Sequence, residues 1–146
     1  MKFTNFYGLA FMLVIMIPNI IFAAKNKDGF ENLWKNKFVE LFEQIGRFGC
    51  FAFMIVIIPG MGFSFYSKRE FILYLIIDTV LLTAYVLIWI LCFKTNSVFK
   101  SLALSIIPSV IFLASGILTR YIALIVSAVI FAPCHILISY KNAKMN

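Results

Sequence analysis

The chain has 146 residues, of which 63% are hydrophobic and only 13% are charged, and its mean hydropathy is +1.00. Soluble proteins contain about 45–50% apolar and about 25% charged residues, so a water-soluble fold of this chain would expose large apolar patches. The composition therefore excludes a soluble globular domain and predicts a single all-α integral membrane domain over residues 1–146. The net charge of +7 does not indicate a nucleic-acid partner, because the basic residues lie between apolar segments and form no recognition motif.

Five apolar segments approach the roughly 20 residues that a helix needs to cross a bilayer. Only Thr119 and Arg120 separate the last two, which should form an antiparallel hairpin. The first segment could instead be a signal peptide, but Phe22 is large where a cleavage site has a small residue, so we expect the segment to be retained. The sequence thus predicts a bundle of about five transmembrane helices, at about residues 6–24, 48–66, 71–93, 101–118 and 121–140.

The connection between the first two segments is the only long one. Asp28 and Glu31 have the spacing of a capping box, which predicts a helix beginning near Gly29. Apolar residues then recur every three or four positions, as on one face of a helix. They are Phe30, Leu33, Trp34, Phe38, Leu41, Phe42 and Ile45. This pattern predicts an amphipathic interfacial helix over about residues 29–45, lying on the membrane surface.

The basic residues predict the orientation of the chain. Nine of the 13 Lys and Arg residues fall on the side of the membrane that holds the C-terminus, and four fall on the other side. Because cytoplasmic loops are enriched in Lys and Arg, we expect the N-terminus outside and the C-terminus in the cytoplasm.

Four polar residues are predicted to form one connected site. Counting helix rise, Asn19 and His135 both lie about 20 Å from the outer face of the membrane. Glu43 and Arg47 lie just beyond this level and have the favourable spacing of a helical ion pair. Buried polar groups in lipid seek partners, so we expect the first and fifth helices to be adjacent, with Asn19 near His135. A structural role for each residue and an anion or lipid-headgroup site at Arg47 both stay open.

Asp78 is a separate candidate. It lies about 10 Å below the outer face, too far from His135 for a direct pair. A carboxylate at this depth is costly, so it must have a polar neighbour or carry a proton. We consider two roles for Asp78: a hydrogen bond that fixes helix packing, and an intramembrane site for a proton or ion.

No residue pattern in the sequence indicates a cofactor or a catalytic centre. The three cysteines, at positions 50, 92 and 134, form no CxxC motif, so we expect neither a disulfide framework nor a metal site. His135 follows Cys134 directly, and the two side chains would diverge by about 100° on a helix. Nucleotide-binding, hydrolase and zinc-protease motifs are also missing from the sequence.

Four segments carry a resemblance. MIPNIIFAAKNK (16–27), EQIGRFGC (43–50), SIIPSVIFLASGIL (105–118) and HILISYKN (135–142) resemble segments of a group of small, uncharacterised bacterial integral membrane proteins. The resemblance covers most of the chain. It implies a location in the bacterial inner membrane and supplies no activity, so no functional residue is carried over from it.

Three functions agree with these observations. We expect first a non-enzymatic accessory or regulatory subunit, whose partners are the lipid bilayer and other membrane proteins or a second copy of itself. The second is a small oligomeric transporter or channel that uses Asp78 or the polar site. The third is a membrane enzyme acting on a lipid headgroup through Arg47, Glu43 and His135.

Overall fold

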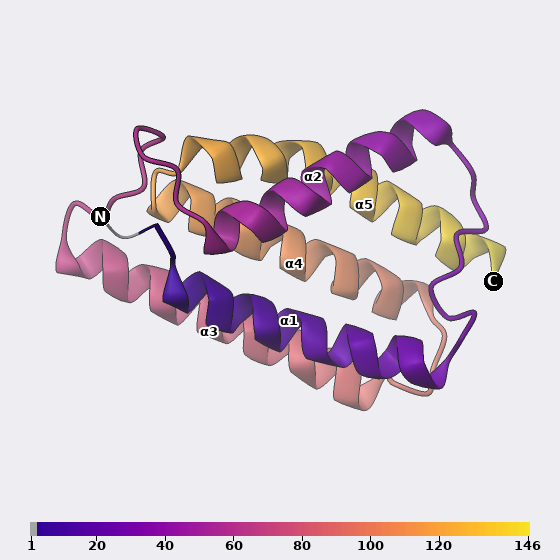
Figure 1. Ribbon diagram of the computed structural model, residues 1–146. Coiled ribbons are helices and arrows are strands. Elements are labelled where there is room, and N and C mark those ends of the chain that lie inside the picture. Colours follow the sequence, from indigo (N-terminus) through magenta and orange to yellow (C-terminus); the bar gives the residue numbers. More distant parts are fainter. Residues whose placement is uncertain (1–2) are drawn as a thin grey trace.

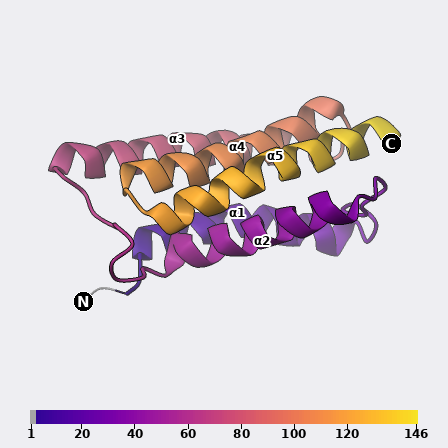
Figure 2. The ribbon, with the colours of Figure 1, turned by 90° about the horizontal axis from the view of Figure 1, so that it is seen from above.

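The computed structural model describes residues 3–146, and these fold into five helices arranged in two layers (Figures 1 and 2). One layer contains α3, α4 and α5, and the other contains α1 and α2 (Figure 2). α1 packs on α3, α2 packs on α5, and the central α4 packs between α3 and α5. The helices are α1 (Phe6–Lys25), α2 (Lys37–Ile55), α3 (Lys68–Leu91), α4 (Val98–Leu118) and α5 (Ile122–Met145). The predicted all-α membrane bundle is confirmed.

Four of the helices, α1, α3, α4 and α5, are long and apolar enough to cross a membrane. Only 22% to 39% of the apolar stretch of each is buried inside the bundle, so many of their apolar side chains remain at least partly exposed. In water such a surface would be strongly unfavourable, whereas lipid tails cover it without cost. These four helices lie within a few residues of the predicted segments. α1 begins at one end of the bundle and α5 ends at the other (Figure 1).

The predicted division of residues 29–66 into an interfacial helix and a second span is wrong. A single helix, α2, replaces both, and it begins only at Lys37. Its N-cap is Asn36, whose side chain accepts hydrogen bonds from the amides of Phe38 and Val39, while Glu40 accepts one from the Asn36 amide. These reciprocal bonds satisfy the free amides of the first turn. The capping box proposed at Asp28 starts no helix, and residues 26–36 are irregular.

α2 ends at Ile55, well before the predicted residue 66, because the following segment is held in another conformation. Val56 pairs with Thr4 in an isolated antiparallel bridge. Pro59 disfavours helix at the residue before it, and Gly60 and Gly62 adopt φ values of +87° and +93°, which glycine tolerates. Residues 56–67 form a loop, which backbone hydrogen bonds join to Thr119 and Ile122 at the connection between α4 and α5.

α2 has its apolar face turned outward and its polar face turned inward. Its exposed large apolar side chains are Phe38, Leu41, Phe42, Ile45 and Phe48, whereas the charged Glu43 is buried. A helix at the surface of a soluble protein shows the opposite pattern. α2 also carries four charged residues, which separates it from the four candidate spans. The predicted amphipathic character of residues 38–45 is thus present, but the polar face contacts protein.

Glycines allow α2 to approach α5 closely. A Cβ atom added at Gly46 would lie 2.6 Å from the backbone nitrogen of Phe131, and one added at Gly49 would lie 2.4 Å from the Ser127 hydroxyl oxygen. Because backbone atoms cannot rotate away, Gly46 is the position where the two helices touch most rigidly. This contact brings the polar face of α2 against the middle of α5.

Candidate functional site

Glu43, Arg47 and His135 form a cluster between α2 and α5, which we call the Glu43 cluster. The Nδ1 atom of His135 lies 2.9 Å from Glu43 Oε1. The Arg47 Nε–H donates to the same oxygen at 3.0 Å, and a second Arg47 nitrogen contacts Glu43 Oε2. Both carboxylate oxygens therefore have a cationic or imidazole partner, which is the arrangement that a buried carboxylate requires.

The sequence and the packing position these three groups in different ways. Glu43 and Arg47 are one helical turn apart on α2, so local geometry alone brings them together. His135 is 92 residues from Glu43 and is oriented by stacking on Phe131 at a centroid distance of 4.5 Å. Phe131 is also the residue that Gly46 contacts. The close approach at Gly46 thus places the imidazole within reach of the carboxylate.

The members of the Glu43 cluster differ in their access to the surroundings. The Glu43 side chain is 3% exposed, the His135 side chain 28%, and the Arg47 side chain 43%. Glu43 is therefore the enclosed centre of the cluster, and Arg47 and His135 cover it. These charge-assisted hydrogen bonds join α2 to α5. Both oxygens of the Glu43 carboxylate already have a partner in the protein.

Asn19 does not belong to the Glu43 cluster. Its side-chain amide donates to the Tyr85 hydroxyl at 2.7 Å and to the Ile15 carbonyl at 2.8 Å. Tyr85 lies on α3. The helix that carries Asn19, α1, packs on α3 and α2 and not along α5. The predicted bond between Asn19 and His135 is wrong. The depth estimate gave the level of each residue along the membrane normal, but it carried no information on which helices are neighbours.

Asp78 lies at the contact between α3 and α4 and is completely buried. The Ser115 hydroxyl donates to Asp78 Oδ2 at 2.6 Å. Oδ1 of Asp78 has no hydrogen-bond partner among the described residues. Tyr74, one turn away on α3, accepts a hydrogen bond from the Asn5 side chain at 3.1 Å. Asp78 is therefore separate from the Glu43 cluster, as its depth predicted.

Sequence reasoning missed the environment of Lys100, which entered the sequence analysis only as one of the nine basic residues on the side of the C-terminus. It is 5% exposed, and its ammonium group donates to the carbonyls of Phe93 and Thr95, both at 3.2 Å. It also lies 4.6 Å from the ring centroid of Phe22 and 5.2 Å from that of Trp89. Cation–π contacts and the free carbonyls that follow α3 together compensate its burial. Phe22 and Trp89 are far from Lys100 in the sequence, so no local pattern indicated these contacts.

The remaining potential ligands are dispersed. Within residues 3–146 there is no group of three or more His, Cys, Asp or Glu side chains that could hold a metal ion. Cys50 is fully buried against the core, and Cys92 and Cys134 are half-buried free thiols. These residues pack as small apolar side chains.

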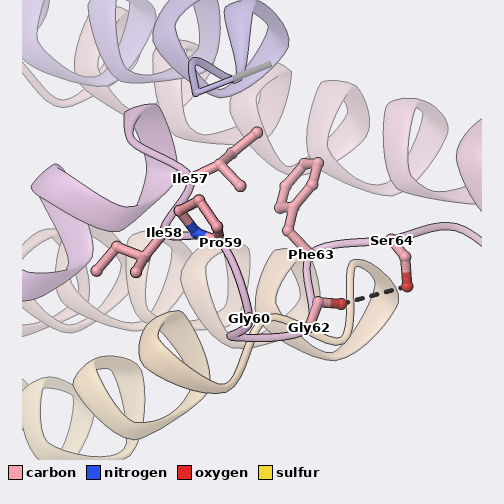
Figure 3. A pocket seen from close by; sticks show the side chains of 7 residues that line it. All are labelled: Ile57, Ile58, Pro59, Gly60, Gly62, Phe63 and Ser64. Atoms are coloured by element: carbon pink, nitrogen blue, oxygen red, sulfur yellow. Dashed lines mark hydrogen bonds between the residues drawn. The ribbon is translucent and has the colours of Figure 1, made fainter. Parts of the chain in front are cut away.

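Two shallow hollows on the described surface do not contain the candidate residues. One, of about 380 Å³, lies on the loop after α2 (Figure 3) and is lined by Ile57, Ile58, Pro59, Gly60, Gly62, Phe63 and Ser64. The other, of about 330 Å³, lies on the outward face of α3 between Leu75 and Val80. Neither is lined by Asp78 or by a member of the Glu43 cluster, so neither hollow opens onto the candidate polar groups.

Comparison with known proteins identifies no relative: no protein family, no curated protein and no solved structure matches this chain. The functional argument therefore rests on the sequence and on the geometry described above.

Proposed function

We propose that the chain is a non-enzymatic accessory or regulatory subunit of a bacterial inner-membrane assembly, with its C-terminus in the cytoplasm. One observation carries the proposal. The hydrogen bonds of the Glu43 cluster hold α2 to α5, and its central carboxylate is 3% exposed. A catalytic or transport site needs polar groups that can exchange partners with a substrate.

The surface of the bundle supports the same proposal. α2 presents the large apolar side chains Phe38, Phe42 and Phe48 to its surroundings, with exposures of 78%, 50% and 68%. In a membrane such a face contacts either lipid or the helix of another protein. We propose that this face of α2 is where a partner protein binds.

Site-specific photocrosslinking in native membranes tests the proposal. A photoreactive amino acid is placed at Phe42, which is exposed on α2, and at Ile76, which is exposed on α3. Leu82, which is buried in the core, is the matched control position. We expect one discrete protein adduct from position 42, and no intermolecular protein adduct from the control. If positions 42 and 76 both yield lipid adducts alone, the subunit proposal is wrong.

The alternative function is a small oligomeric transporter, and Asp78 is the specific observation that favours it. Carboxylates buried in membrane spans frequently mark proton or ion pathways. Purified protein in liposomes with an imposed pH or sodium gradient distinguishes the two functions. A flux that Asp78→Asn abolishes favours transport, whereas no flux above that of empty liposomes favours the subunit.

A further inference from the structure

Asp78 occupies an enclosed position in the α3–α4 contact that its neighbours only partly satisfy. Asp78 and Ser115 are both fully buried, and a single hydrogen bond of 2.6 Å joins them. Asp78 Oδ1 is buried and has no partner among the described residues. Leaving a carboxylate oxygen unpaired in a dry contact is strongly unfavourable, so the geometry demands a further group at Oδ1.

Among residues 3–146, no cation is placed to supply that group. α1 and α4, the helices packed against α3, each carry one charged residue, Lys25 and Lys100. Lys100 is 15 residues from Ser115 along α4, which is about 22 Å by helix rise. Lys25 ends α1 at that same end of the bundle, where its ammonium lies over the Phe93 ring.

Groups closer to Asp78 are neutral or already engaged. Arg120, beyond the end of α4, makes two hydrogen bonds to Glu70 on α3. Tyr74, the titratable neighbour on α3, accepts from the Asn5 amide. The hydroxyl group of Thr119, one turn beyond Ser115, donates to the Ser115 carbonyl at 2.6 Å. Within the described part of the chain, Asp78 therefore has no cationic partner on the elements that pack against it.

A metal ion does not fit the position either. Calcium takes about six to eight oxygen ligands, and magnesium takes about six. The α3–α4 contact offers one carboxylate and one hydroxyl that is already bonded to it. A proton needs only one oxygen, adds no volume to a packed contact, and removes the charge that makes burial costly.

We propose that Asp78 and Ser115 form a buried proton-binding site between α3 and α4. A proton from the aqueous phase binds to Oδ1, while Oδ2 keeps the hydrogen bond from Ser115, and on release the proton returns to water. The protonated carboxyl is neutral and fits the closed contact. The ionised carboxylate draws water in or separates α3 from α4, so proton occupancy controls the closure of this contact.

The chain is well suited to a direct test, because Asp28 and Asp78 are its only aspartates. The full-length protein is labelled with ¹³C at the aspartate side-chain carboxyl and placed in lipid nanodiscs. NMR then shows two carboxyl resonances, and Asp28, which is exposed, is the internal reference. Asp28→Asn assigns the remaining signal to Asp78 without altering the buried site.

We expect the Asp78 resonance to have the chemical shift of a protonated carboxyl at neutral pH and to move to the carboxylate value only in alkaline solution. Ser115→Ala should shift the resonance at neutral pH, because it removes the hydrogen bond at Oδ2. Asp78→Asn, which is neutral and of the same shape, should leave the backbone spectrum independent of pH in this region. A carboxylate shift for Asp78 at neutral pH, with or without sodium, overturns the proposal.

Discussion

Replacing Gly46 by alanine should loosen the contact between α2 and α5, although alanine is the better helix former. The added Cβ would lie 2.6 Å from the Phe131 backbone nitrogen, about 0.8 Å closer than the 3.4 Å at which ordinary contact begins. Backbone atoms of α5 cannot rotate out of the way. α2 must therefore move outward by a comparable distance.

The magnitude follows from two opposing effects. Helix propensity favours alanine over glycine by about 1 kcal/mol, whereas overpacking of this kind costs about 1–3 kcal/mol. The outward shift also stretches the bond between His135 and Glu43 from 2.9 Å to about 3.7 Å, which is beyond hydrogen-bonding range. Losing this charge-assisted bond adds about 1.5–3 kcal/mol. The steric and electrostatic effects exceed the propensity gain, so we expect a net destabilisation of about 1.5–5 kcal/mol.

Cys50 reports this change directly, because it lies one turn after Gly46 and is fully buried. In a background where Cys92 and Cys134 are replaced by serine, a maleimide probe should label Cys50 faster in Gly46→Ala than in the parent protein. Thermal unfolding in micelles should occur at a lower temperature. Ala52→Val, which adds bulk to the exposed side of the same helix, is the matched control and should change neither measurement.

A Gly46→Ala protein that is as stable as its parent, with Cys50 equally protected, would falsify this account of the α2–α5 contact. Gly49→Ala adds a gradation to the test. Its added Cβ meets the Oγ and Cβ atoms of Ser127, at 2.4 Å and 2.9 Å, rather than backbone, so it should cost less than Gly46→Ala.

Three further predictions concern other contacts. A double-mutant cycle of Glu43→Gln and His135→Ala, followed by thermal unfolding, should give a coupling energy of about 1–3 kcal/mol. A second cycle that pairs His135→Ala with Asn19→Ala should give additive effects. Coupling in this second cycle would contradict the separation of Asn19 from the Glu43 cluster. Tyr121→Phe removes a hydroxyl that accepts a hydrogen bond from one loop amide at 2.9 Å and donates one to a loop carbonyl at 3.0 Å. Hydrogen exchange in the loop after α2 should therefore accelerate. An unchanged exchange rate would show that these bonds do not hold the loop. A topology reporter fused to the C-terminus should read cytoplasmic, and a reporter inserted at residues 67–70 should read external. The same reading from both reporters would reject an odd number of membrane crossings between these two positions.

The beginning of α2 differs from the start predicted by local sequence. The spacing of Asp28 and Glu31 predicted a helix near Gly29, whereas the structure begins α2 after Asn36. There Asn36 satisfies two amides of the first turn, while Glu40 satisfies the amide of Asn36 itself. Glu40 also accepts a hydrogen bond from the side chain of Asn32, which holds the preceding segment in a non-helical path. The observed start of α2 therefore depends on contacts that the folded chain provides.

The sequence by itself determined the medium and the positions of α1, α3, α4 and α5, because hydropathy and helix length are properties of contiguous residues. It also determined the pairing of Glu43 with Arg47, which are one turn apart. Tertiary structure alone decided that His135 joins them and that Asn19 bonds to Tyr85. Counting residues along a helix gives the depth of a side chain, but its neighbours depend on the lateral order and rotation of the helices. These are set by the packing of the whole bundle, here by the close approach at Gly46, and no single segment contains that information.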